Sequence, residues 1–216
     1  MADQALKLMT VDEFLTWDDG TDTRYELDAG VVSPVANQSN AHGTIKGALC
    51  GLIGNALRGR SPIHGEVSPV VRINHNTMWM TDFAVNARLT TREPAELILI
   101  VEVLSAPSRT HDLGRKLPDY IALPYLREIW MVDAERRWVQ VWTRIGDAVF
   151  TVATIMGNAV FESPLLNSLV ELDDIYANSG LCPPLTGSVH APSPAWCRRG
   201  RWPRPEPRGS SRECRP

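Results

Sequence analysis

The spacing of apolar residues in two segments predicts one helix and one buried strand. Over residues 41–58 the apolar side chains recur every three or four positions, which is typical of a helix that buries one face. Three glycines within it, Gly47, Gly51 and Gly54, weaken the helix intrinsically and predict close packing on a sheet. Residues 97–104 form an almost continuous apolar run instead, which indicates a central strand that is buried on both faces.

The rest of the chain alternates between short helices and groups of strands. Thr10 and Glu13 have the spacing of a capping box, which predicts a short helix ending at Trp17. Turn residues between segments 24–27 and 30–35 predict a β-hairpin. The remaining predicted elements are strands at 67–73, 78–86, 96–104, 128–132, 138–143 and 148–155, and a helix from Thr110 to about Ala122. This order predicts a single α/β or α+β domain with a mixed sheet flanked by helices.

Two carboxylates interrupt segments that are otherwise apolar. Glu102 lies within the predicted central strand, and Asp82 lies in the middle of the mostly apolar segment 78–85. A buried carboxylate is costly unless it is protonated, paired with a cation or bound to a metal. If the two strands form a hairpin, Asp82 and Glu102 meet on one face, where Mg²⁺ or Mn²⁺ would relieve their repulsion. A structural ion pair is the alternative interpretation of Glu102.

Lys116 is the third residue to which chemistry can be assigned. Lysine is scarce in this chain, which has only Lys7, Lys46 and Lys116 beside 19 arginines. Because Asp112 precedes Lys116 by four positions on the predicted helix, the two side chains can form an exposed salt bridge. The other interpretation places the Lys116 ammonium beside a metal-bound water or a scissile phosphate. Pro118 is expected to kink this helix, which would move Lys116.

The charge of the chain is distributed unevenly along its 216 residues. The net charge is −3, but seven arginines and two glutamates give residues 183–216 a charge of +5, which leaves −8 for the first 182 residues. An acidic body argues against broad electrostatic wrapping of nucleic acid, although it permits a local, metal-mediated contact with phosphate. The composition predicts an extension at 1–8, a folded domain at 9–177 and a disordered Pro/Arg-rich tail at 178–216. The tail is either sequence without a selected role or a basic arm that binds nucleic acid.

Several other classes of protein are excluded by what the sequence lacks. No apolar stretch has the length of a membrane-spanning helix, and the first residues do not resemble a secretory signal. The four cysteines have no CxxC spacing, which argues against a zinc site. We therefore expect a reduced, cytoplasmic protein that does not contact a membrane.

Several motifs follow one another in order over residues 9–176. They are Thr10-Val-Asp-Glu-Phe, Arg24-Tyr-Glu-Leu-Asp-Ala-Gly, Asp82, Glu102-Val-Leu-Ser, Asp112-Leu-Gly-Arg-Lys116-Leu, Tyr120 and Glu128-Ile-Trp-Met-Val-Asp133. Each motif alone is weak, but the ordered series resembles the bacterial Uma-type family of restriction endonucleases. The resemblance implies the PD-(D/E)XK nuclease fold, a mixed central sheet flanked by helices, which agrees with the element order.

The resemblance also implies a role for individual residues. Asp82 stands for the acidic residue of the PD element and Glu102 for that of the (D/E)XK element. Together with the Val103 carbonyl they would bind Mg²⁺ or Mn²⁺, and Lys116 on the following helix would replace the lysine missing two positions after Glu102. The residues given a supporting role are Glu26, His42 and Asp112. The alternatives are a charge on a solvated strand face for Glu26 and a polar residue in a helix's first turn for His42.

The function implied by the resemblance is metal-dependent hydrolysis of phosphodiester bonds in nucleic acid, with DNA as the expected substrate, by a homodimer. The sequence itself does not distinguish DNA from RNA. The alternative is a catalytically inactive nuclease-fold protein that serves as a binding or dimerisation module, which Pro118 and the acidic body favour. A hydrolase with another substrate is a third interpretation. Trp138 and Trp142 share one face of a predicted strand, with Gln140 between them, and would stack on bases or pack in a sheet or dimer.

Overall fold

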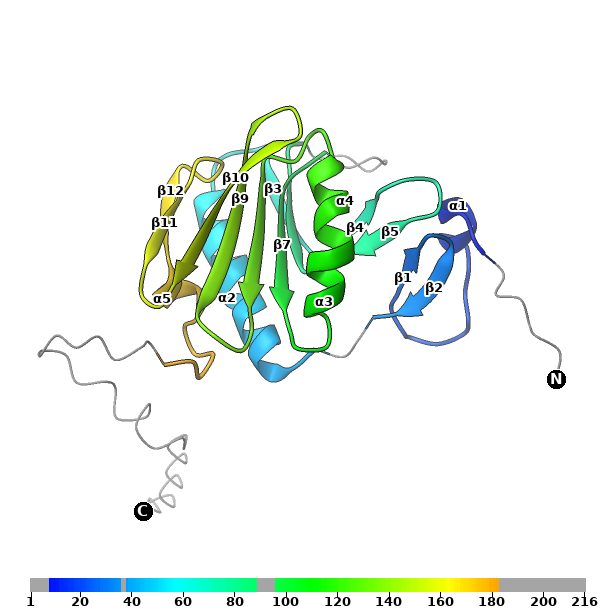
Figure 1. Cartoon of the computed structure of the whole chain (residues 1–216), viewed down its shortest axis with the longest axis horizontal. Coiled ribbons are helices and arrows are strands. Elements are labelled where there is room, and N and C mark those ends of the chain that lie inside the picture. The colour runs from blue at the N-terminus through cyan, green and yellow to red at the C-terminus, as the bar shows by residue number, and fades with distance from the viewer. Residues whose placement is uncertain (1–7, 36–37, 89–95, 183–216) are drawn as a thin grey trace, which may run out of the picture. The chain divides into compact units, whose positions relative to one another are not determined.

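The computed structural model of the protein describes residues 8–35, 38–88 and 96–182 (Figure 1). Its first elements are α1 (Val11–Phe14), β1 (Tyr25–Asp28), β2 (Val31–Pro34), α2 (Asn40–Ala56), β3 (His64–Val67), β4 (Val70–Arg72), β5 (Met78–Met80) and β6 (Phe83–Asn86). They are followed by β7 (Leu97–Leu104), α3 (Arg109–His111), a π-helical segment (Asp112–Lys116), α4 (Leu117–Ala122), β8 (Glu128–Asp133), β9 (Trp138–Gly146), β10 (Val149–Met156), β11 (Val160–Ser163), β12 (Ser168–Glu171) and α5 (Leu172–Ile175). These elements confirm the predicted mixed fold, although β11, β12 and α5 were not expected from the sequence.

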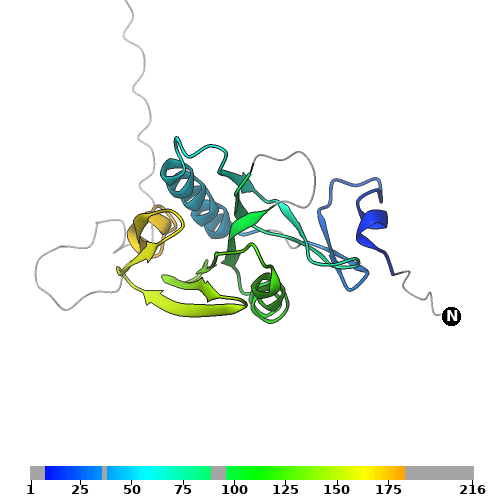
Figure 2. The ribbon, with the colours of Figure 1, turned by 90° about the horizontal axis from the view of Figure 1, so that it is seen from above.

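The central sheet has six strands in the order β10-β9-β8-β7-β6-β3. Neighbouring strands are antiparallel except β7 and β8, which are parallel because the helical segment from α3 to α4 crosses over between them. The predicted central strand, β7, is buried along its whole length. One face of the sheet packs on α2, α5 and the β11–β12 hairpin, and the other packs on α4, as the view from above shows (Figure 2).

A second sheet of four strands, in the order β2-β1-β5-β4, lies beside the central one (Figure 1). Two segments that were each expected to form one strand are divided between the two sheets. Residues 67–73 separate into β3 and β4 because Ser68 adopts a left-handed φ of 52° and Pro69 has no N–H to donate. Residues 78–86 separate into β5 and β6 at Thr81 and Asp82. Asp82 therefore lies where the chain crosses from one sheet to the other.

Helix α2 confirms the predicted helix, but the expected role of its glycines is wrong. Its N-cap is Ser39, whose hydroxyl accepts a hydrogen bond from the His42 N–H. Gly47, Gly51 and Gly54 are exposed, and a side chain added at any of them would meet nothing within 4 Å. The apolar stripe itself faces the sheet, so the glycines, which lie between the stripe positions, fall on the solvent side.

Gly65 on β3 is the glycine at which close packing does matter. A Cβ atom at this position would overlap the ring of Phe83, which is only 4% exposed and cannot move aside. Gly65→Ala is therefore expected to lower the free energy of unfolding by about 1–3 kcal/mol. Gly47→Ala is the matched control and should raise it by up to about 1 kcal/mol, because alanine is the better helix former. Guanidinium unfolding of both variants tests this contrast, and equal effects would contradict it.

The helix expected from Thr110 to about Ala122 is present but irregular. It begins at Arg109, so Thr110 does not cap it, and its middle is a π-helical segment in which the Leu117 N–H donates to the Asp112 carbonyl. Pro118 lies directly after this segment, in the first turn of α4, where a missing N–H costs little. The π-helical turn thus accommodates Pro118 and leaves Lys116 facing the core.

The predicted extension and tail remain predictions. Residues 1–7 and 183–216 lie outside the described residues, which include only Leu8 of the extension and 178–182 of the tail. Within the described part of the chain, no helix combines the length and the apolar character needed to cross a membrane.

Candidate active site

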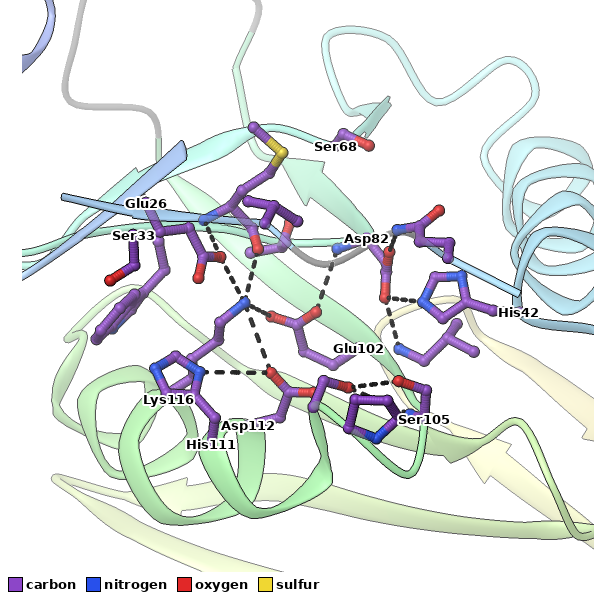
Figure 3. Close-up of a pocket in the computed structure, with 18 of the residues that line it drawn as sticks. Glu26, Ser33, His42, Ser68, Asp82, Glu102, Ser105, His111, Asp112 and Lys116 are labelled. Carbon is purple, nitrogen blue, oxygen red and sulfur yellow. Dashed lines mark hydrogen bonds and ion pairs between the residues drawn. The ribbon is translucent and has the colours of Figure 1, made fainter. Parts of the chain in front are cut away.

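A pocket of about 340 Å³ lies where the two larger sheets meet (Figure 3). The residues that line it come from β1, from the Met80–Asp82 crossing between the sheets, from the end of β7 and from the helical segment that follows. All six residues with a predicted catalytic or supporting side chain contribute to its lining, namely Glu26, His42, Asp82, Glu102, Asp112 and Lys116. The structure therefore brings together side chains that are up to 90 positions apart in the sequence.

Lys116 lies at the centre of a buried ionic cluster. Its Nζ atom lies 2.6 Å from a carboxylate oxygen of Glu26, 3.6 Å from one of Asp112 and 3.7 Å from one of Glu102. It also donates a hydrogen bond of 2.9 Å to the Met80 carbonyl. Burial lowers the pKa of Lys116, but the three carboxylates raise it by more, so that the net shift is upward and the ammonium stays charged.

Glu102 connects this cluster to Tyr120 and to the backbone of Asp82. Its carboxyl group accepts a hydrogen bond of 2.6 Å from the Tyr120 hydroxyl and one of 3.3 Å from the Asp82 N–H. Burial outweighs the attraction of the Lys116 ammonium and raises the pKa of Glu102 to about 8. A cation entering the pocket would therefore compete with a proton for this group.

Asp82 is held by four donors from three parts of the chain. One carboxylate oxygen lies 3.0 Å from His42 Nε2 and accepts a hydrogen bond of 2.8 Å from the Val103 N–H. The other accepts hydrogen bonds from Gln38, at 2.9 Å, and Lys46, at 3.3 Å. Burial raises the pKa of Asp82, but His42, Val103 and Lys46 lower it by more, so the net shift is downward. Asp82 is therefore ionised and fixed in orientation.

The strands beside Asp82 and Glu102 pair as predicted, but the two carboxylates do not share their binding partners. Strands β6 and β7 form the expected antiparallel pair, and the register of Phe83 with Val101 brings Asp82 beside Glu102. The two carboxylates nevertheless have different partners, since Asp82 contacts His42 of α2 and Glu102 contacts Lys116 (Figure 3). Glu102 also contacts Tyr120.

Of the alternative interpretations made from the sequence, the one for Glu26 is wrong, and those for His42 and Lys116 are correct only in part. Glu26 is 9% exposed and is not a charge on a solvated face, because it accepts a hydrogen bond from the Met80 N–H and pairs with Lys116. His42 does lie in the first turn of α2, but it is 5% exposed and bonded to Asp82. The salt bridge between Asp112 and Lys116 exists, but it is buried rather than exposed.

Sequence reasoning missed three residues that hold the two carboxylates: Gln38, Lys46 and Tyr120. Lys46 follows His42 by one helical turn, so both reach Asp82 from the same side of α2, and the Lys46 ammonium also donates to the Ser68 hydroxyl at 2.7 Å. The scarcity of lysine was a usable signal, because the two described lysines both bind carboxylates of this site. Gln38 gave no such signal.

The donors at this site suit a hard divalent cation. Asp82 and Glu102 offer only oxygen ligands, which Mg²⁺ and Mn²⁺ prefer. Among the described residues, however, no group of three or more His, Cys, Asp or Glu side chains is arranged as a metal cluster. The Val103 N–H already donates a hydrogen bond to Asp82. A cation would thus be held by few protein ligands and would replace at least one of the donors that now contact Asp82.

Comparison with known proteins gives the fold and the family. The crystal structure of "a putative nuclease belonging to DUF820" from Anabaena variabilis superposes with a TM-score of 0.63 at 16% sequence identity, covering 78% of this chain and 97% of that one. No protein of curated function matches the sequence. The sequence profile of the Uma2 family, described as "putative restriction endonuclease", matches residues 11–173 and so spans nearly all of the folded part. The chain therefore belongs to the Uma2 family.

Proposed function

We propose that this protein is a metal-dependent endonuclease that hydrolyses phosphodiester bonds in nucleic acid, with DNA as its substrate. The observation that carries the proposal is the convergence of an ionised Asp82, Glu102 and a charged Lys116 on one pocket. Membership of a restriction endonuclease family, whose members generally use divalent metals, supports it. The homodimeric state implied by the resemblance and the cytoplasmic location expected from the composition remain parts of this proposal.

In the proposed mechanism the protein positions the groups that meet the phosphate. Asp82 and Glu102, together with the Val103 carbonyl, would hold Mg²⁺ or Mn²⁺, which when bound polarises the phosphate and acidifies a water molecule. Lys116 would stabilise the negative charge that develops on the phosphate oxygens. Glu26 and Asp112 keep the Lys116 ammonium charged and in place.

Further side chains orient the two acidic residues. His42, Lys46 and Gln38 fix the Asp82 carboxylate, and the Tyr120 hydroxyl fixes that of Glu102. These are positioning residues, because each acts on a carboxylate and not on the phosphate itself. Such preorganisation limits the rearrangement needed when substrate binds.

The proposal predicts cation-dependent cleavage by the purified full-length protein. Plasmid DNA and a mixed-sequence RNA would be incubated separately with Mg²⁺ or Mn²⁺, and with EDTA as the control. We expect cleavage of DNA with either cation and none with EDTA. Cleavage of RNA alone would contradict the substrate assignment. If neither nucleic acid is cut and calorimetry detects no Mn²⁺ binding, the proposed activity is wrong.

The second candidate is a catalytically inactive nuclease-fold protein that acts as a binding module. One observation favours it: both oxygens of Asp82 are already bonded to protein donors. The same experiment separates the two functions, since an inactive protein would bind DNA without cutting it under any cation condition.

A further inference from the structure

The two edges of the central sheet differ in how well they are protected. At one edge, β3 is only four residues long and carries His64 and Glu66, whose side chains lie 2.9 Å apart. Short strands and charged side chains are the usual devices that keep a free edge from pairing with another chain. At the other edge, β10 is eight residues long, and no described strand pairs with its outer side. Only the β10 edge lacks such protection.

The composition of β10 suits pairing with another strand. Val149–Met156 contains neither a charged residue nor proline, and its members are mostly β-branched or apolar. The four central residues, 151–154, are all exposed, so solvent reaches this strand from both faces and along its outer edge. The backbone N–H and C=O groups on that side are free to form a ladder.

Exposed apolar side chains gather in the same part of the protein. Among the described residues, six of the eleven large hydrophobic side chains that are exposed lie between positions 145 and 169. Val152 and Met156 of β10 are 44% and 60% exposed. They pair across the strands with Trp142 and Trp138, so the two predicted tryptophans continue the same face. This concentration is typical of an interaction surface.

We propose that the homodimer, which is part of the proposed function on which this inference rests, forms through the outer edge of β10. This edge would pair with the β10 edge of a second copy of the chain, antiparallel and about a two-fold axis. Two identical strands meet antiparallel when they are related by such an axis, and the contact closes after two subunits. Because β10 is uncharged, no like charges are brought together by the symmetry. The central sheets of the two copies then form one continuous sheet.

The side chains near the edge have to contribute to this contact. A stable interface buries about 800 Å² on each partner, and a strand of eight residues, roughly 26 Å long, supplies only part of that area. The remainder would come from Val152, Met156 and the β11–β12 hairpin, which belongs to the same core as Ile155 of β10 and exposes Val160 and Leu169. Trp138 and Trp142 then support the interface in preference to stacking on bases.

Sedimentation velocity of the full-length protein over a range of concentrations tests the proposal. We expect the wild type to form a dimer of twice the 24.0 kDa chain mass. Val152→Lys would place two lysines near the two-fold axis and should weaken the dimer at least about tenfold, because like charges would oppose each other. Val67→Lys on β3, at the opposite edge and 60% exposed, is the matched control and should leave the dimer unchanged.

A second measurement separates loss of pairing from loss of folding. Amide hydrogen exchange in β10 of the wild type should slow as the protein concentration rises, whereas that of Val152→Lys should not. The two proteins should melt alike at concentrations too low for dimerisation. A wild type that sediments as a monomer at every concentration would overturn the proposal. So would a dimer that Val152→Lys leaves intact, or one that both variants dissociate equally.

Discussion

Glu102→Gln is expected to reduce cleavage of DNA on the order of 10³-fold and to abolish detectable Mn²⁺ binding. The amide keeps the shape of the side chain but cannot supply a negatively charged ligand. Because burial raises the pKa of Glu102 to about 8 without a cation, the buried site can accommodate a neutral amide. The hydrogen bond from Tyr120 can be kept, so stability should change by no more than about 1 kcal/mol. Cleavage rates, calorimetry and unfolding curves would be measured together.

Asp82→Asn should also abolish cleavage, but with a larger loss of stability. Asp82 is ionised and receives four donors, and an asparagine amide would point an N–H group toward one of them. Glu162→Gln, on the exposed side of β11, is the control for general effects and should leave cleavage unchanged.

If Glu102→Gln keeps wild-type activity while the fold is intact, Glu102 is not a ligand of the catalytic cation.

The positions of the main site residues could be predicted because they break a local pattern. A carboxylate within a buried apolar strand has to find a partner, and this requirement singles out Glu102 and Asp82 from the sequence alone. The hairpin of β6 and β7 then follows from the two strands being consecutive in the chain. Lys116 stands out through the scarcity of lysine and through the family resemblance.

Other features depend on tertiary structure and left no local signal. The division of residues 78–86 between two sheets cannot be read from hydrophobicity, because both halves of the segment are apolar and bury side chains. One of the hydrogen bonds that hold Asp82 comes from Lys46, which is 36 positions away. Only the packing of α2 on the sheet brings the two residues together. The π-helical turn is a further case, since Pro118 predicted a kink but not its form.

Lys116→Met is expected to lower the free energy of unfolding by about 3–5 kcal/mol, because it leaves buried carboxylates without their cation. Glu26, Asp112 and Glu102 are each at most 9% exposed, and all three contact the Lys116 ammonium. The matched control is Arg115→Met, one residue earlier, where a side chain that is 56% exposed pairs with Asp28. Breaking that surface pair should change stability by less than about 1 kcal/mol.

The loss in Lys116→Met should shrink as the pH falls. Burial already raises the pKa of Glu102 and Asp112, and removing the ammonium raises both further. A carboxyl group whose pKa is higher in the folded than in the unfolded state binds more protons when folded. The free energy of unfolding of the variant therefore rises as the pH is lowered toward about 4, the pKa of these groups in the unfolded chain. Adding Glu26→Gln should recover part of the loss, because an amide oxygen can still accept the Met80 N–H. Urea unfolding at several pH values measures both effects, and a pH-independent loss below about 1 kcal/mol would show that the cluster around Lys116 does not hold the fold.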